Sequence, residues 1–109
     1  MPKKNLKMTN DEAREELILH FCQILEYWEK ESRTPDTRGK MEGMLHSILV
    51  TLDGGSGMMP GFKVSALVPP TDVKFHKKQG NKYFPHGEDL GGGLHEILYV
   101  IGRKHGKIH

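Results

Sequence analysis

The stretch ILVTLDGGSGMMPGFKVSALVPP, residues 48–70, decides the fold, because a glycine-rich centre separates two apolar runs within it. Residues from about Leu45 alternate between two faces as a strand would, and residues 62–68 alternate again. Alternation with a period of two is typical of strands, and the pair Asp53-Gly54 is a strong turn signal. The stretch therefore predicts a β-hairpin with a long connection.

The run before the turn, residues 40–54, also permits a helix. Five apolar residues in it have helical spacing: Met41, Leu45, Ile48, Leu49 and Leu52. We prefer the strand, because β-branched residues are frequent in the run and the turn signal follows directly. The second run is expected to end at Pro69-Pro70, since proline cannot donate a hydrogen bond to a strand ladder.

Helices are predicted near both ends of the chain. Thr9 and Glu12 have the spacing of a capping box, and apolar residues at helical spacing follow, which predicts a helix over about residues 10–31. A closing helix of about three turns is predicted by the i, i+3, i+4, i+7 spacing of Leu94, Ile97, Leu98 and Ile101. Gly102 or Gly106 is expected to end it.

Together these elements predict an α+β protein of the order helix–β-hairpin–helix, with a small antiparallel sheet and the helices packed on one face. A chain of 109 residues suits a single domain, residues 1–109, in which residues 1–8 and 105–109 form flexible tails. Residues 71–93 are rich in turn formers and are expected to be irregular, with a short strand at residues 73–75 as an alternative. The sheet edge or hairpin face is then free for dimerisation.

The glycine-rich connection matches none of three ligand-binding loops. A Walker phosphate loop requires Gly-Lys-Ser/Thr, whereas Gly61 is followed by Phe-Lys-Val. The chain lacks the third glycine that the dinucleotide-binding fingerprint requires, and it has Met58 where a nucleophile elbow requires a glycine. The connection is therefore interpreted as a bend. Two alternatives are open for its Met58 and Met59: they form an adaptable contact surface for a partner, or they fold back beneath the hairpin.

Positive charge is concentrated in the second half of the chain. Residues 1–55 carry a net charge of −2 and residues 56–109 a net charge of +4, with histidine counted as neutral. The candidate contact residues there are Lys74, Lys77, Lys78 and Lys82. Phe75, Tyr83 and Phe84 lie among or beside them, and exposed rings near lysines are a feature of nucleic-acid binding. Nucleic acid is thus one hypothesis, and ordinary solvated lysines are the preferred one.

Seven histidines raise the question of a metal site. Zinc sites in small proteins typically use close pairs of ligands, and the closest pair here, His105 and His109, lies at the C-terminal end. A second hypothesis makes His46, His95 and Glu96 the metal ligands, and it requires that they meet in one pocket. No cofactor is predicted, and no catalytic residue is assigned.

The sequence has no feature of a membrane-spanning or secreted protein. No apolar run approaches the ~20 residues needed to cross a bilayer, and no apolar segment follows the lysines near the N-terminus. The single cysteine, Cys22, cannot form an internal disulfide and is expected to be a small buried apolar residue of the first helix. We therefore expect a cytoplasmic protein.

The segments EGMLHSILVTLDGGSGMMPGFKVSALVPP (residues 42–70) and LHEILY (residues 94–99) resemble a group of small uncharacterised proteins of bacteria and their phages or prophages. In that group an Asp-Gly turn leads into Pro-Gly-Phe and a second strand, and a Leu-His-Glu helix closes the chain. The likeness covers less than half of this chain. It implies an accessory protein of a phage or mobile element, and it implies no activity and no site residues.

The favoured hypothesis is a small α+β binding or accessory module that is not catalytic and self-associates as a homodimer. A further protein partner is compatible with it, and no membrane partner is expected. The first alternative is a nucleic-acid-binding protein that uses residues 74–82 and the C-terminal tail. The second alternative is a metal-dependent enzyme that uses His46, His95 and Glu96, with Asp53 as a further carboxylate.

Overall fold

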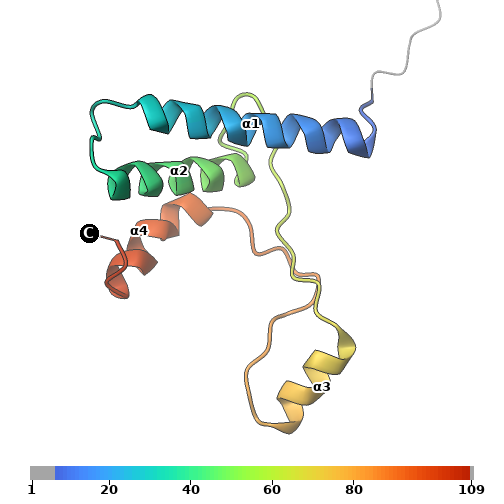
Figure 1. Cartoon of the computed structure of the whole chain (residues 1–109). Coiled ribbons are helices and arrows are strands. Elements are labelled where there is room, and N and C mark those ends of the chain that lie inside the picture. Colours follow the sequence, from blue (N-terminus) through green and yellow to red (C-terminus); the bar gives the residue numbers. More distant parts are fainter. Residues whose placement is uncertain (1–6, 109) are drawn as a thin grey trace, which may run out of the picture. The chain divides into compact units, whose positions relative to one another are not determined.

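The computed structural model describes residues 7–108, and in them it contains four helices and two extended segments that pair incompletely (Figure 1). The helices are α1 (Asn10–Lys30), α2 (Thr37–Leu52), α3 (Pro70–Lys78) and α4 (Leu94–Lys104). The chain forms two compact units, Met1–Ile48 and Leu49–His109, and the boundary between them lies within α2. Of the tails expected to be flexible, residues 1–6 and 109 lie outside the described part.

The first helix begins and ends where the sequence predicts. The N–H of Glu12 donates to Thr9 Oγ1 over 3.1 Å, and the N–H of Thr9 donates to Glu12 Oε1 over 3.0 Å, which completes the capping box. After Lys30, Glu31 is extended, and its carboxylate accepts hydrogen bonds from the backbone and the guanidinium group of Arg33. Local interactions therefore define both ends of α1.

The strand predicted from about Leu45 is wrong, because residues 37–52 form α2. Asp36 caps this helix: its carboxylate accepts a hydrogen bond of 2.9 Å from the N–H of Gly39. The apolar residues of the run satisfy a period of two and a period of 3.6 equally, so the alternation alone does not distinguish strand from helix.

Within the first unit, α1 and α2 run antiparallel and side by side (Figure 1). They meet closely at Trp28 and Gly43, where a Cβ atom added to Gly43 would lie 2.5 Å from carbon atoms of the indole ring. The indole Nε1–H also donates to Ser47 Oγ over 2.9 Å. Glycine lets the ring lie against the α2 backbone, and this tertiary contact favours the helix over the strand.

Gly54 follows the end of α2 and does not form the turn of a hairpin. Its φ angle is 84°, its N–H donates to the carbonyl of Thr51, and the N–H of Gly55 donates to the carbonyl of Val50. This pair of bonds is the Schellman motif, in which a glycine of positive φ follows a helix. The same motif ends α3 and α4. An Asp-Gly pair suits a hairpin turn and a helix end equally, because both need positive φ.

The strand predicted over residues 62–68 is also wrong, because this extended segment pairs only incompletely, and with residues 86–91. The N–H of Leu90 donates to the carbonyl of Val64 over 2.7 Å, whereas the N–H of Val64 donates to the carboxylate of Asp89 over 3.0 Å. A side chain thus takes the place of a backbone acceptor. For this reason the described residues contain an isolated antiparallel bridge and no continuous strand.

The predicted α+β class, antiparallel sheet and β-hairpin are therefore wrong. Residues 7–108 are mostly helical, and they contain no sheet for helices to cover or for a second copy to extend. Residues 71–78, expected to be irregular with a short strand at residues 73–75 as an alternative, belong to α3. The helix begins at Pro70, because proline suits the first turn of a helix, where its missing N–H is not needed. The predicted closing helix is confirmed as α4, with Gly106 after its cap.

Few side chains of the described residues are buried. Ile108 is 6% exposed and lies against Gly102 in the last turn of α4, and Thr51 is 1% exposed. Large apolar side chains remain exposed on all four helices. Apolar surface is therefore available for a partner. Over the same residues, no helix has both the length and the apolar character needed to cross a membrane.

Candidate functional site

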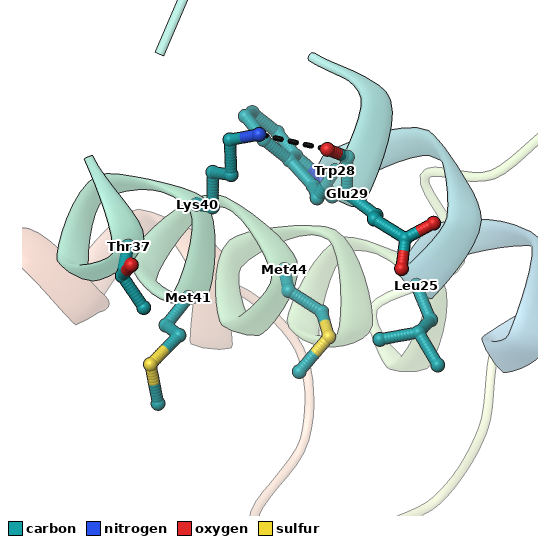
Figure 2. Close-up of a pocket in the computed structure, with 7 residues that line it drawn as sticks. All are labelled: Leu25, Trp28, Glu29, Thr37, Lys40, Met41 and Met44. Carbon is teal, nitrogen blue, oxygen red and sulfur yellow. Dashed lines mark hydrogen bonds between the residues drawn. The ribbon is translucent and has the colours of Figure 1, made fainter. Parts of the chain in front are cut away.

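A shallow apolar groove lies between α1 and α2 in the first unit (Figure 2). Its volume is about 240 Å³. Both helices line it, with Leu25, Trp28 and Glu29 from α1 and Thr37, Lys40, Met41 and Met44 from α2. Figure 2 shows the side chains of Leu25, Met41 and Met44 pointing to the same side of the hairpin. The two helices thus share one apolar surface.

The apolar surface continues along α1 beyond the groove. Ile18 lies seven residues before Leu25, which is two helical turns and therefore the same side of α1. Ile18 is 59% exposed, Leu25 54% and Met41 59%. We call Ile18, Leu25, Met41 and Met44 the hairpin face. Cys22 lies between Ile18 and Leu25 along α1 and is exposed, so the expectation that it is buried is wrong.

The groove is suited to apolar side chains and not to a whole small molecule. Pockets for small molecules usually enclose about 300–1,000 Å³, and the groove is smaller and open. At its edge, the Nζ of Lys40 donates to the carbonyl of Glu29 over 2.7 Å, which links the two helices (Figure 2). The side chains of another helix fit such a surface better than an enclosed ligand does.

A second cluster, in the second unit, joins the end of α2 to the beginning of α4. The carboxylate of Asp53 accepts hydrogen bonds from the N–H groups of Leu94 (3.0 Å) and His95 (2.8 Å), at the positive end of the α4 dipole. His95 Nδ1 lies 2.5 Å from Oδ2 of the same carboxylate. Since both oxygens of Asp53 are engaged within the fold, the residue acts as a helix cap.

The environment of Asp53 stabilises its ionised form. The side chain is only 4% exposed, and this burial raises the pKa of Asp53. The hydrogen bonds from His95 and Leu94 outweigh burial and hold the pKa at about 2, below the usual value of 3.8. The carboxylate is therefore ionised at neutral pH, where it binds the beginning of α4.

The predicted metal ligands belong to different parts of the fold. His46 lies in α2 within the first unit, whereas His95 and Glu96 lie in the first turn of α4 within the second. Among residues 7–108, no group of three or more His, Cys, Asp or Glu side chains is placed to hold a metal ion. The metal hypothesis stays a prediction without structural support.

The glycine-rich connection after α2 closes on itself. The N–H of Phe62 donates to the carbonyl of Leu52 over 3.0 Å. Gly54 and Gly61 approach so closely that a Cβ atom on Gly54 would lie 3.1 Å from Gly61 Cα. The connection is therefore a closed bend that leads α2 into the extended segment.

Replacing Gly54 by alanine is expected to destabilise the second unit by about 1–2 kcal/mol, because alanine is strained at positive φ and its methyl group would press on the Gly61 backbone. Urea denaturation followed by far-UV circular dichroism measures this effect. Gly57→Ala is the matched control, since no atom within 4 Å would meet its Cβ. Equal stability of the two variants would contradict the role of Gly54 at the helix end.

The predicted contact residues lie at two places in the second unit. Met58 is 76% exposed in the bend, and Met59 is half-buried. All the predicted lysines are exposed: Lys74, Lys77 and Lys78 on α3, and Lys82 after it. Contact of these residues with a partner stays a prediction.

Two features of the site are not predicted by the sequence patterns. For the groove, the sequence contains one indication that could have been used, which is Gly43 within a run of helical spacing. A small residue in a helix permits the close approach of another helix. The Asp53 cap has no local signal, since its partners Leu94 and His95 lie 41 and 42 residues away.

Comparisons of the chain with protein-family models, with curated proteins and with solved structures find no match. The resemblance to small bacterial and phage proteins therefore stays a prediction, and any function must be inferred from the surfaces described above.

Proposed function

We propose that this chain is a non-catalytic helical binding module that self-associates, and that the hairpin face is the surface through which two copies pair. The observation that supports this most directly is the exposure of Ile18, Leu25 and Met41, each more than half exposed. In the proposed dimer, two α1–α2 hairpins pack face to face as a four-helix bundle. Each copy presents the same surface, as a two-fold interface requires.

The physical reason is that a pair of helices forms a single layer, whereas stable domains contain at least two packed layers. Trp28 lies against Gly43 in the contact between α1 and α2, whereas Ile18, Leu25 and Met41 stay more than half exposed beside it. A second hairpin supplies the second layer. Polar groups at the edge of the groove, such as those of Glu29 and Lys40, then form the rim of the interface.

The expected dimer is weak and reversible. Complete burial of one side chain of this size contributes about 1.5–3 kcal/mol, so each half-exposed side chain contributes about 1 kcal/mol more in the dimer. The eight side chains of two hairpin faces together contribute about 8 kcal/mol. The loss of translational and rotational freedom opposes this by at least about 4 kcal/mol. The net gain is thus at most about 4 kcal/mol, and we expect a dissociation constant of about 1 mM.

Ile18→Glu and Met41→Glu are each expected to abolish self-association, because both copies of the new carboxylate would be buried at the two-fold interface. Sedimentation velocity between about 10 µM and about 1 mM measures the dimer fraction. Leu67→Glu is the control, since Leu67 is 86% exposed in the extended segment of the second unit and lies outside the hairpin face. Far-UV circular dichroism verifies that all three variants stay helical. Variants that associate as the wild type does would overturn the proposal.

Cys22 supplies an independent readout, because it lies on α1 between Ile18 and Leu25 and is exposed in the single chain. Its reaction with a thiol reagent is expected to slow as the protein concentration rises, and to be independent of concentration in Ile18→Glu. Slow reaction at every concentration would show that the hairpin face is covered within one chain. That result would contradict the dimer.

A reducing compartment, the cytoplasm, is part of this proposal. The only cysteine of the chain is unpaired and exposed, and such a thiol is suited to a reducing environment. Recovery of the protein in the cytoplasmic fraction of its cells tests the assignment, and recovery in the membrane or secreted fraction contradicts it.

A further inference from the structure

The second unit carries a surface of different chemistry. Three lysines of α3 have i, i+3, i+4 spacing and therefore lie on one side of the helix, and a fourth follows in the next segment. We call these residues, Lys74, Lys77, Lys78 and Lys82, the basic face, and all four are exposed. The acidic residue of α3, Asp72, precedes Lys74 by two positions and therefore lies on another side of the helix. The positive charge of the basic face is thus not neutralised within α3.

Three aromatic rings lie in the segment of the basic face or directly after it, and they are open to solvent. Phe75 is 57% exposed, Tyr83 44% and Phe84 68%. Rings of this size are normally buried, and none of these three belongs to the apolar contacts described above. Exposed rings beside lysines are the combination that proteins use to bind single-stranded nucleic acid, with bases stacked on rings and phosphates near the cations.

The geometry that brings Tyr83 to Lys77 is set by the end of α3. Gly80 has a φ angle of 72°, its N–H donates to the carbonyl of Lys77 over 3.2 Å, and the N–H of Asn81 donates to the carbonyl of His76 over 2.8 Å. This Schellman motif reverses the chain directly after the helix. The Nζ of Lys77 consequently lies 5.5 Å from the centroid of the Tyr83 ring, within the range of a cation–π contact.

We propose that the basic face and its bordering rings bind single-stranded nucleic acid. The lysines neutralise consecutive phosphates, and Phe75 and Phe84 stack on unpaired bases. The proposal goes beyond self-association and involves only residues of the second unit, so the two proposals can fail separately.

Single-stranded nucleic acid is favoured over a lipid surface and over a duplex. Apart from Pro70, α3 has two apolar residues, Val73 and Phe75, whereas a helix that lies in a membrane has a broad apolar face. Bases in a duplex are stacked on one another, so exposed rings have no base faces to contact there. An acidic protein segment would pair with the lysines but would leave the rings without a function.

The charge part of the proposal is tested with a fluorescently labelled oligo(dT) of about 12 nucleotides, whose binding is measured by fluorescence anisotropy over a series of salt concentrations. The logarithm of the wild-type binding constant is expected to fall with the logarithm of salt with a slope of about −3, as four lysines on a single strand predict. The double variant Lys77→Glu/Lys78→Glu is expected to bind at least about 10-fold more weakly with a shallower slope. Lys63→Glu, which alters an exposed lysine outside the basic face, is expected to bind as the wild type does.

The stacking part is tested with Phe75→Ala and Phe84→Ala. Each is expected to weaken binding by about 5-fold to 100-fold without changing the salt slope, because a ring contributes stacking and no charge. Leu67→Ala is the control for removal of an exposed apolar side chain. Far-UV circular dichroism verifies the fold of each variant. Ile18→Glu, which is designed to prevent self-association, is expected to bind the same oligonucleotide with the affinity that one wild-type chain has.

Other outcomes of the same assay would overturn the proposal. Equal binding by wild type and the double lysine variant would exclude the basic face. Tighter binding to a duplex of the same length would point to backbone charge alone, and Phe75→Ala and Phe84→Ala would then bind as tightly as the wild type. Binding of poly-glutamate, or of vesicles containing anionic phospholipid, more tightly than oligo(dT) would assign the surface to an acidic protein or to a membrane.

Discussion

Replacing Gly43 by alanine is expected to destabilise the α1–α2 hairpin by about 1–3 kcal/mol. The new methyl group would lie 2.5 Å from carbon atoms of the Trp28 ring, so the ring or the helix must move. The sign of the change in stability tests the contact, because a glycine-to-alanine substitution inside a helix without such a contact stabilises the protein by about 1 kcal/mol. Urea denaturation followed by the fluorescence of Trp28, the only tryptophan of the chain, measures the stability of the hairpin directly.

A double-mutant cycle separates the contact from any general effect of the substitution. In a Trp28→Leu background the ring is absent, so Gly43→Ala is expected to become neutral or stabilising. Because this background lacks tryptophan, all four proteins of the cycle are compared by far-UV circular dichroism. A Gly43→Ala substitution that destabilises equally in both backgrounds would show that the ring does not lie on Gly43.

Asp53→Asn is expected to remove a large part of the acid sensitivity of the second unit. The folded-state pKa of Asp53 is about 2, below its ordinary value of 3.8. For a carboxyl group with a lowered pKa, the stabilisation is fully present above about pH 4 and is lost as the pH falls through about 2. Wild type is therefore expected to be the more stable protein at neutral pH, and its advantage over Asp53→Asn is expected to decrease below about pH 4 and to be mostly lost at about pH 2.

The difference between the two pH profiles isolates Asp53 from the other carboxylates. Glu31 also has a pKa held at about 2, chiefly by the side chain of Arg33, but it is unchanged in both proteins and its contribution cancels. Thermal unfolding followed by circular dichroism between about pH 7 and about pH 2 gives the two profiles. Profiles that stay parallel over the whole range would contradict the role of Asp53 as the cap of α4.

The elements that the sequence predicts correctly are those with local signals. The bounds of α1 follow from the capping box of Thr9 and Glu12 and from the hydrogen bonds between Glu31 and Arg33, which involve neighbours in the chain. The helix α4 has apolar residues at helical spacing and a glycine after its cap. Such contacts form within one or two turns, so a sequence pattern contains all the information that they require.

The elements that the sequence predicts wrongly are those with two equally good local solutions. The run before Gly54 fits a strand and a helix, and the Asp-Gly pair fits a hairpin turn and a helix end. Trp28 resolves the first ambiguity by lying on Gly43 of α2. The strand predicted after the bend is wrong as well. Its segment makes only an isolated bridge at about residue 89, and side-chain acceptors interrupt the ladder.

The candidate surfaces divide in the same way. The lysines and rings around α3 can be named from the sequence because they are neighbours in the chain, while the structure adds the chain reversal at Gly80 that brings Tyr83 to Lys77. The hairpin face combines residues of two helices and depends on their pairing. Local composition and spacing therefore determine which segments of this protein are α1 and α4 and where its charge lies. The helical state of α2, the Asp53 cap and the hairpin face are decided by tertiary contacts, because the groups that form them lie far apart in the chain.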